Sequence, residues 1–339
     1  MSEQSELKKR IEDKYNELNF SGVVYAVEGE STLIQSAHGF ADRSENRVNK
    51  IDTRFGIASG CKIFTAVAIC QLVEKGVISF ESRLADCLDI HFPHFDEEIT
   101  VEHLLTHTSG VPDYFDEDVM DDFEELWIDR PVYRIDSLQA FLPIFQNEQM
   151  KFKPGRQFHY NNAGYILLGL IIEQQTDSIF TDYIESEIFK KAGMTASGYF
   201  ELDRLPENTA LGYIDHPEDQ TWRTNIYSIP KKGGSDGGAF TTAADMTAFW
   251  NALLGFKLLH EETTKQLLTP AVHVNEELHY GYGIWLNQKD HHVYKYHVMG
   301  YDPGVSFRSA VYPDQNRMVT ILSNHETEPY DILEVIEKG

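Results

Sequence analysis

The chain has 339 residues, of which 42% are hydrophobic, and a formal net charge of −25 at pH 7. So acidic a surface repels phosphate backbones, which argues against a nucleic-acid-binding protein. No apolar run approaches the roughly 18 residues of a membrane span, and the charged N-terminus lacks the apolar centre of a secretory signal. Unless a leader has been removed, we therefore expect a cytoplasmic protein that does not bind membranes.

The hydrophobic periodicity predicts strands at both ends of the chain and helices between them. Expected helices cover residues 7–18, 63–75, 100–107, 162–177, 179–193, 241–255 and 329–339, and expected strands lie within 21–42 and 279–325. This order predicts an α+β fold in a single domain, with one sheet built from both chain ends and flanked by helices. The sheet lobe would cover about 1–60 and 240–339, and a largely helical second lobe about 61–239.

Serine stands three residues before lysine at three places, namely Ser5, Ser59 and Ser228. Only Ser59 follows an apolar approach, "FGIAS", and opens an apolar helix. Residues i and i+3 share a helix face, so Lys62 can reach the hydroxyl of Ser59. The N–H groups at the helix start would favour negative charge there. A lysine needs burial or a neighbouring cation to act as a base. Alternatively, Ser59 is a helix cap and Lys62 is solvated.

A second candidate is "KPGRQFHYNNAGYILLG", in which Tyr160 and Asn162 precede an apolar helix. A tyrosine at a helix edge can transfer protons, and an asparagine two residues later can hold a substrate amide or the lysine. By itself this pattern is more often a helix-capping turn.

Taken together, these segments resemble the serine β-lactamase and penicillin-binding-protein superfamily, especially its class C β-lactamase, D-aminopeptidase and esterase branch. The stretches that carry the resemblance are "ITVEHLLTHTSGVPDY", "KPGRQFHYNNAGYILLG", "IFKKAGMTASGYF", "GGAFTTAADMTAFWNALL" and "YGYGIWL", and it extends from Gly22 to Asn324. The resemblance implies the β-lactamase/transpeptidase-like fold, with an antiparallel sheet. It also implies a serine hydrolase that needs no cofactor and acts on a small-molecule or peptide substrate.

The same resemblance assigns roles to residues. Ser59 would be the nucleophile, Lys62 its proton acceptor, and Tyr160 a second proton-transfer group. Asn162 would orient the substrate and the lysine. The oxyanion hole would be formed by the backbone N–H of Ser59 and one near Tyr301.

The third family motif departs from its pattern. "YHVMGYDPG" places Val298-Met299-Gly300 where a Lys-Thr-Gly or His-x-Gly sequence is expected. His297, Gly300 and Tyr301 complete the candidate substrate-binding set with Asn162, but His297 lies one residue early and would face away unless a bulge corrects it. The missing cation favours a neutral ester, amide or lactone over a carboxylate-bearing β-lactam or peptide.

Three other interpretations remain at this point. His103 and His107 have helical spacing, but the glutamate of a zinc-protease motif is missing, so we expect a structural role. Cys61 could be a nucleophile, although packing is the expected role of all three cysteines, Cys61, Cys70 and Cys87. The chain could also be a binding or sensing protein, in which Ser59 either traps an acyl group without turnover or does not react at all. The acidic stretch Asp113 to Leu126 is expected to be a solvated loop or helix face.

Overall fold

The computed structural model describes residues 3–338 and has one large antiparallel sheet between two helical layers. The strand order is β2-β1-β14-β13-β12-β11-β10-β9. The strands are β1 Gly22–Glu28, β2 Ser31–His38, β9 Val272–Asn275, β10 Leu278–Tyr280, β11 Trp285–Lys289, β12 His292–Asp302, β13 Val305–Tyr312 and β14 Arg317–Ser323. Strand β1 pairs with β14, so both chain ends build the sheet, as the sequence predicts.

Most helices come from the middle of the chain. They are α1 Glu3–Glu17, α2 Lys62–Glu74, α3 Leu84–Cys87, α4 Val101–Leu105, α5 Leu142–Phe145, α6 Asn162–Thr176, α7 Phe180–Ile184, α8 Lys190–Ala192, α9 Ala243–Leu254, α10 Glu261–Leu267 and α11 Pro329–Glu337. Three two-stranded sheets are also present: β3 Phe40–Asp42 with β4 Arg47–Val48, β5 Phe55–Gly56 with β8 Phe240–Thr241, and β6 Tyr213–His216 with β7 Thr221–Thr224. Within residues 3–338, the structure contains no helix of the length and apolarity needed to cross a bilayer.

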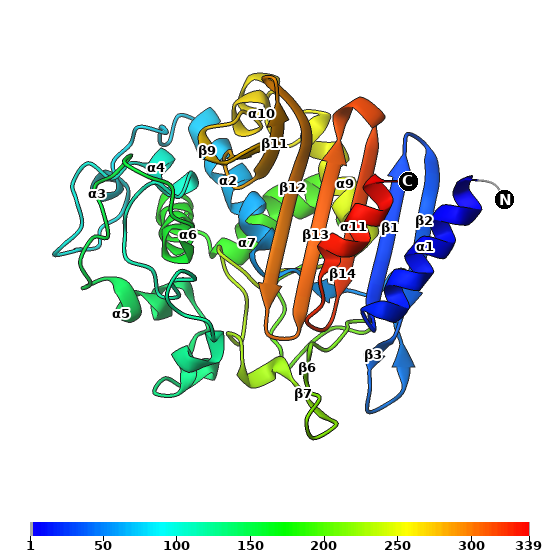
Figure 1. Cartoon of the computed structure of the whole chain (residues 1–339). Helices are drawn as coiled ribbons and strands as arrows, with labels where there is room; N and C mark the ends of the chain where they lie inside the picture. The colour runs from blue at the N-terminus through cyan, green and yellow to red at the C-terminus, as the bar shows by residue number, and fades with distance from the viewer. Residues whose placement is uncertain (1–2, 339) are drawn as a thin grey trace.

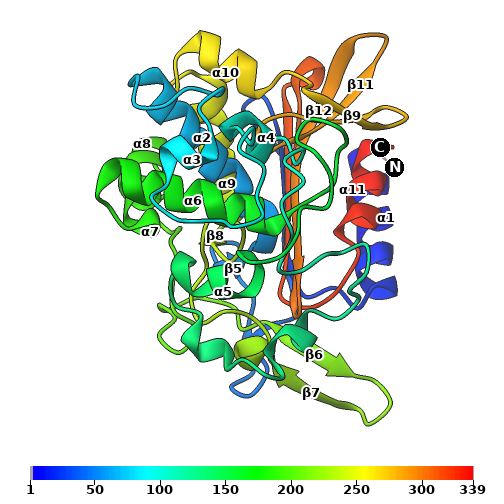
Figure 2. The same cartoon turned by 90° about the vertical axis from the view of Figure 1, so that its left-hand side faces the viewer.

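The two faces of the sheet bury different hydrophobic clusters because side chains alternate along each strand. Val24 packs in a smaller cluster with Ile332 and Leu333 of α11, whereas the adjacent Val23 belongs to the main core. Figure 2 shows the sheet edge-on, with α1 and α11 on one side and α2, α6 and α9 on the other. The fold class is therefore the α+β arrangement expected from the sequence.

Helix α2 is the central helix of the main core. Its residues from Lys62 to Leu72 are all buried, which is typical of a helix that is apolar around its whole circumference. Beside it, α6 buries its residues from Asn162 to Ile172. The N-termini of these two helices carry Ser59-Lys62 and Asn162, so their packing places the candidate residues close together.

Candidate active site

Ser59 lies in a short 3₁₀ helix, Ala58–Cys61, that joins β5 to α2. The preceding Ala58 has φ +45°, a left-handed conformation that non-glycine residues rarely adopt. The backbone around it is held in place: Ile57 N–H donates to the Ala239 carbonyl at 2.9 Å, and the Ala58 carbonyl accepts from Gly238 N–H at 3.2 Å. Such a strained residue beside a candidate nucleophile is often part of a functional site.

Lys62 is buried, with 2% of its surface exposed. Its Nζ lies 2.8 Å from Ser59 Oγ, 2.9 Å from Asn162 Oδ1 and 2.6 Å from the Asp236 carbonyl oxygen. These three contacts match the bonding capacity of an amine and fix its position. The structure therefore brings Ser59, Lys62 and Asn162 together, and Lys62 is not a solvated surface lysine.

Tyr160 lies on the other side of the amine, with its ring centroid 5.0 Å from Lys62 Nζ. Its ring also packs against His107 at 4.4 Å and stacks on Trp285 at 6.1 Å. Burial raises the pKa of Tyr160 well above its usual range, and the charge of Glu117 raises it further. Tyr160 is therefore a neutral phenol that can donate a proton.

Asp113 caps the N-terminus of α6. Its carboxylate accepts from the backbone N–H groups of Asn162 at 2.7 Å and Ala163 at 2.9 Å, next to the Asn161 side-chain cap. Burial raises the pKa of Asp113 to about 7, against the lowering effect of these two donors. This carboxylate fixes the helix end that presents Asn162 to Lys62.

Asp236 is the second acid that sequence reasoning overlooked. It lies in the glycine-rich "GGSDGG" segment, where its carbonyl accepts from Lys62 and its carboxylate accepts from the hydroxyl of Tyr114. A Cβ on Gly237 would lie 3.9 Å from Ser59 N, an ordinary van der Waals distance, so the backbone of this segment runs directly beside the nucleophile. Burial raises the pKa of the Asp236 carboxyl, and the Lys62 charge opposes that shift.

The stretch Asp113 to Leu126, the acidic segment, differs only in part from the expected solvated loop. Tyr114 and Asp116 in it are buried, and its first residues contact α6 and the "GGSDGG" segment. Later acids of the segment, such as Glu117 and Asp121, are exposed as expected, but they also line a cavity. Charge density alone does not predict that these acids line the same cavity as Ser59.

Gly300 is the residue of the third motif that meets the nucleophile. A Cβ at this position would lie 2.7 Å from both Ser59 N and Gly60 N. Pairing of β12 with β13 is regular from Tyr296 to Asp302, without a bulge. His297, three residues before Gly300, therefore points to the face of the sheet opposite to that of Gly300. There it is 4% exposed, and it does not line the cavity beside Ser59. Tyr301 does line that cavity and is 43% exposed.

The two histidines with helical spacing, His103 and His107, make structural hydrogen bonds. His103 Nδ1 accepts from Thr100 N–H at 3.2 Å, as part of the cap of α4. His107 Nδ1 accepts from Asn161 N–H at 3.1 Å, and its Nε2 lies 3.1 Å from the Tyr280 hydroxyl. His107 thus supports the segment that carries Tyr160, in agreement with the expected structural role.

Cys61 is fully buried, and its thiol contacts the Gly234 carbonyl at 3.6 Å. Burial raises the pKa of this thiol to about 12, so it is not a thiolate near neutral pH. The geometry does not support Cys61 as a nucleophile. Cys70 and Cys87 are also free and buried.

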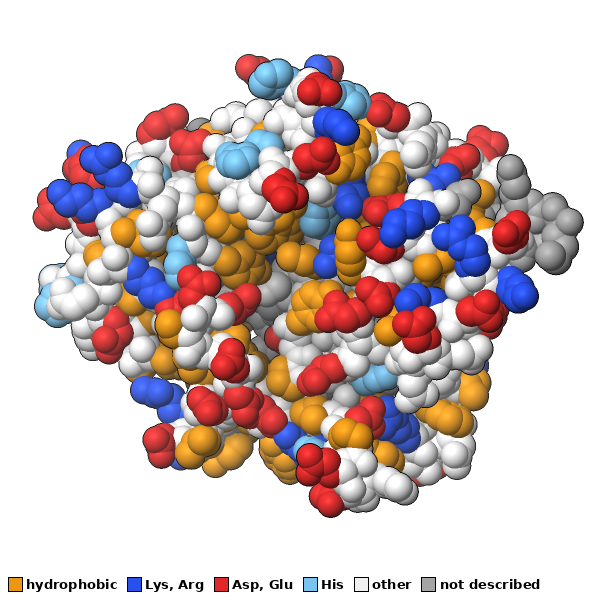
Figure 3. Space-filling model, viewed as in Figure 1, with side chains coloured by type: hydrophobic (Ala, Val, Ile, Leu, Met, Phe, Trp, Pro, Cys, Tyr) orange, Lys and Arg blue, Asp and Glu red, His pale blue; other side chains and the backbone are white. Residues whose placement is uncertain are grey.

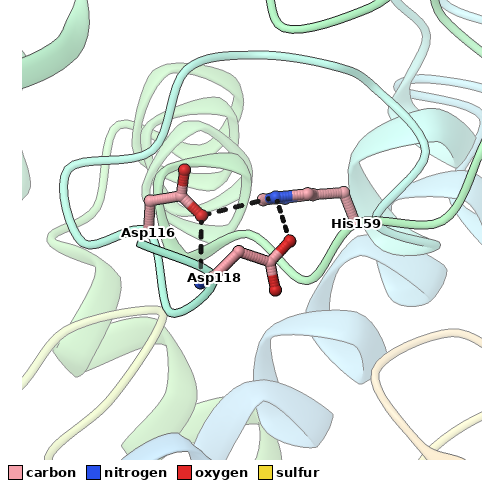
Figure 4. Close-up of side chains that lie close together, drawn as sticks. All are labelled: Asp116, Asp118 and His159. Atoms are coloured by element: carbon pink, nitrogen blue, oxygen red, sulfur yellow. Dashed lines mark hydrogen bonds and ion pairs between the residues drawn. The ribbon is translucent and has the colours of Figure 1, made fainter. Parts of the chain in front are cut away.

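Asp116, Asp118 and His159 converge beside the Tyr160 segment (Figure 4). His159 Nε2 lies 3.4 Å from Asp116 Oδ1 and 3.1 Å from Asp118 Oδ2. The ammonium of Lys151 pairs with Asp116 and lies 3.2 Å from His159 Nε2. Since a lysine already supplies the positive charge, this cluster is an ion-pair network that ties the acidic segment to the chain before Tyr160.

A cavity of about 610 Å³ opens in front of Ser59. Its wall includes Asn162, Asp236, Tyr301 and Asp302. Figure 3 shows a hollow near the end of β12, with acidic side chains on both sides of it. The volume suits a small organic substrate, and Ser59 is within reach of such a molecule.

Comparison with known proteins finds a matching family model and similar chains. The family model described as Beta-lactamase matches residues 7–335. The chain is similar to a crystal structure of a penicillin binding protein from Bacillus halodurans, with 52% identity, TM-score 0.93 and coverage of 97% and 99% of the two chains. It is 30% identical over 324 residues to penicillin-binding protein 4* of Bacillus subtilis (strain 168), which covers 91% of this chain and 69% of that protein.

More distant structures share the fold. D-amino acid amidase from Ochrobactrum anthropi SV3, in complex with L-phenylalanine, has TM-score 0.79 at 21% identity and covers 98% and 99% of the two chains. The chain spans between 62% and 69% of the length of the Bacillus subtilis relatives that it matches.

Proposed function

This chain belongs to the β-lactamase family, and from that premise we propose that it is a serine hydrolase that forms an acyl-enzyme on Ser59. The observation that carries the proposal is the buried Lys62 amine, 2.8 Å from Ser59 Oγ and held by Asn162 and the Asp236 carbonyl. An amine fixed in this way is suited to accept the serine proton during attack, which is the arrangement of an activated nucleophile.

The reaction would proceed in two stages. Lys62 takes the proton of Ser59, whose Oγ attacks the carbonyl carbon, and the N–H groups of Ser59 and Tyr301 stabilise the oxyanion. The neutral phenol of Tyr160 then protonates the leaving group, with the proton replaced from Lys62. Water releases the acyl group through the same two side chains in reverse, as microscopic reversibility requires.

The substrate proposed is an ester or amide without a required carboxylate. Val298 on β12 is an aliphatic residue, 3% exposed, on the same face as Gly300. No lysine or histidine of β12 therefore faces the nucleophile to bind a carboxylate. An amide substrate also agrees with the fold shared with D-amino acid amidase.

Labelling with a fluorophosphonate, read by intact mass, tests the nucleophile. We expect one adduct in the native chain and none in Ser59→Ala, with much slower labelling in Lys62→Ala. Ser5→Ala is a matched control, since Ser5 also stands three residues before a lysine. Adduct formation in Ser59→Ala would refute the proposal. Stoichiometric capture of an ester's acyl group without turnover would instead support the acyl-trapping alternative.

A further inference from the structure

The wall of the cavity in front of Ser59 is strongly acidic. Its carboxylates are Glu117, Asp121, Asp122, Glu124, Asp236, Asp302 and Glu326, and Lys232 is the only lysine or arginine among the described residues that line it. Lys232 donates to the Thr181 hydroxyl at 3.0 Å. Glu124 pairs with Arg223, so one acid of the wall is compensated. The remaining wall is left with an excess of negative charge.

Two of these acids lie close to the nucleophile. Asp302 comes two residues after Gly300, where an added Cβ would lie 2.7 Å from Ser59 N. Asp236 directly precedes Gly237, whose backbone also lies beside Ser59. Among the described residues, no side chain donates a hydrogen bond to Asp302 or Glu117 or forms an ion pair with them. Asp236 is 6% exposed, and the one side chain that donates to its carboxylate is the neutral phenol of Tyr114.

Carboxylates grouped in this way repel one another. Burial raises the pKa of Asp302 to about 7, and the charges of Asp236 and Glu117 raise it further, while Lys62 lowers it. A bound cation would relieve this repulsion and restore the ionised forms. A bound anion would increase it, and Val298 offers no compensating charge.

A metal ion fits this wall less well than an organic cation. Divalent ions need several oxygen ligands that converge on one point. Within residues 3–338 the only acidic or histidine group that converges in this way is Asp116, Asp118 and His159, none of which lines the cavity. A larger ammonium group can instead contact acids that are spread around it.

We propose that the substrate carries an ammonium group within a few bonds of the scissile carbonyl, and that Asp302, Asp236 and Glu117 select it. This inference deepens the proposed function and rests on it. The third motif has no cation that could bind a substrate carboxylate. We infer in addition that the acidic wall favours a substrate of positive charge. Asp302 and Glu117 are the two acids best placed for this role, because no other described side chain engages them, Asp302 follows Gly300 beside Ser59, and the charge of Glu117 acts on Tyr160.

Matched p-nitrophenyl esters test the selection by charge. The esters of 4-(trimethylammonio)butanoate and 5,5-dimethylhexanoate have the same shape and differ by one positive charge, and the glutarate monoester carries a negative charge. A second pair, butyrylthiocholine and its 3,3-dimethylbutyl analogue, places the cation on the leaving group. In at least one pair we expect kcat/KM for the cation to exceed that of the neutral partner by about tenfold or more, which corresponds to about 1.4 kcal/mol. High salt should reduce this ratio by screening.

Substitutions of single acids test which residues produce the preference for the cationic ester. Asp302→Asn and Glu117→Gln should each lower the cation-to-neutral ratio, whatever their absolute rates. Asp290→Asn, which removes the same charge at an exposed turn outside the cavity, should keep it. Glu117 is exposed, so Glu117→Gln gives an answer even if Asp302→Asn fails to fold.

The outcomes separate the two proposals. Equal rates for cationic and neutral partners in both pairs, or faster hydrolysis of the anionic ester, would overturn selection by charge. If neutral esters are then still hydrolysed through Ser59, the proposed function stands. If no ester is hydrolysed and Ser59 forms no adduct, the proposed function fails, and the inference fails with it.

Discussion

At the scale of single residues, Val298 is the position where one substitution should reverse the preference of the site for substrate charge. It is buried on the face of β12 that carries Gly300, next to Ser59. Val298→Lys would place an ammonium on this face, where its attraction for a carboxylate is strengthened by low solvent access. We expect acylation by a fluorescent penicillin to become at least about tenfold faster, with the label absent in the double variant with Ser59→Ala.

Met299→Lys is the matched control for this substitution. It adds the same side chain one residue later on the same strand, but on the opposite face of the sheet. We expect no gain in penicillin labelling from it. An equal gain from both substitutions would show that the overall positive charge matters and that the strand face does not. Thermal melts should accompany both, because the lysine of Val298→Lys replaces a buried valine.

The ionisation of the single residue Asp302 predicts that the preference for a cationic substrate depends on pH. Its pKa is raised to about 7, so its carboxyl is largely neutral below that pH and charged above it. The charged groups acting on it are Asp236, Glu117 and Lys62. We expect the ratio of kcat/KM for the trimethylammonio ester to that of its neutral partner to rise between about pH 6 and about pH 8.

Using a ratio removes pH effects that both esters share, and the quaternary ammonium does not titrate. In Asp302→Asn the rise should largely disappear. A ratio that is flat in the native chain, or that falls as the pH increases, would contradict ionisation of Asp302 as the source of the preference.

The residues that could be predicted are those with a local pattern. Ser59 and Lys62 are one helical turn apart, and the spacing alone places them on one face. Asp113 and Asp236 have no such signal, because they reach Asn162 and Lys62 from 49 and 174 residues away in the chain. The opposite orientation of His297 and Gly300 could be predicted, since it needs only the period of a strand.

At the scale of elements, the packing of α2 against the turn before β11 controls the position of Lys62. Gly283 in that turn has φ +70°, and a Cβ there would lie 2.7 Å from Ala66 Cβ and 2.9 Å from the Lys62 carbonyl oxygen. Gly283→Ala must therefore move the turn or the first part of α2. We expect slower fluorophosphonate labelling of Ser59 and a loss of stability larger than the cost of the left-handed backbone alone.

Gly76→Ala measures that backbone cost separately. Gly76 has φ +69°, and no atom lies within 4 Å of the place that an added methyl group would occupy. Its substitution therefore costs only the strained conformation, about 1 kcal/mol. We expect normal labelling of Ser59 in this variant. If both variants lost the same free energy of unfolding and labelled equally fast, the close contact with α2 would have no influence on the site.

The helices and strands were largely predictable from periodicity, but their mutual arrangement was not. The buried helix α2 and most strands of the sheet follow the expected ranges closely, whereas β9 and α10 lie outside them. The acidic segment has no periodicity, and its place over the cavity depends on single contacts such as that between Tyr114 and Asp236. Contacts between distant segments leave no repeating pattern in the sequence, so function-bearing loops of this kind are found only in the structure.

At the scale of the whole molecule, charge is the dominant feature. The chain has 54 acidic and 29 basic residues, and ion pairs such as Lys295 with Glu337, which joins β12 to α11, use only part of the acids. The compact state holds the unpaired carboxylates closer together than the unfolded chain does, so their repulsion lowers the free energy of unfolding. Salt screens this repulsion, with a Debye length of about 10 Å at 0.1 M.

We therefore expect the melting temperature to rise by a few degrees when NaCl increases from about 0.02 M to about 0.5 M. Surface ion pairs weaken under the same conditions, but each contributes little, so screening of repulsion should prevail. Differential scanning fluorimetry measures the shift, and sucrose at equal osmolality separates screening from solute exclusion. A melting temperature that falls with NaCl would mean that the attractive pairs outweigh the repulsion. The acidic cavity would then be a local feature, set apart from a surface whose charges are balanced in the folded chain.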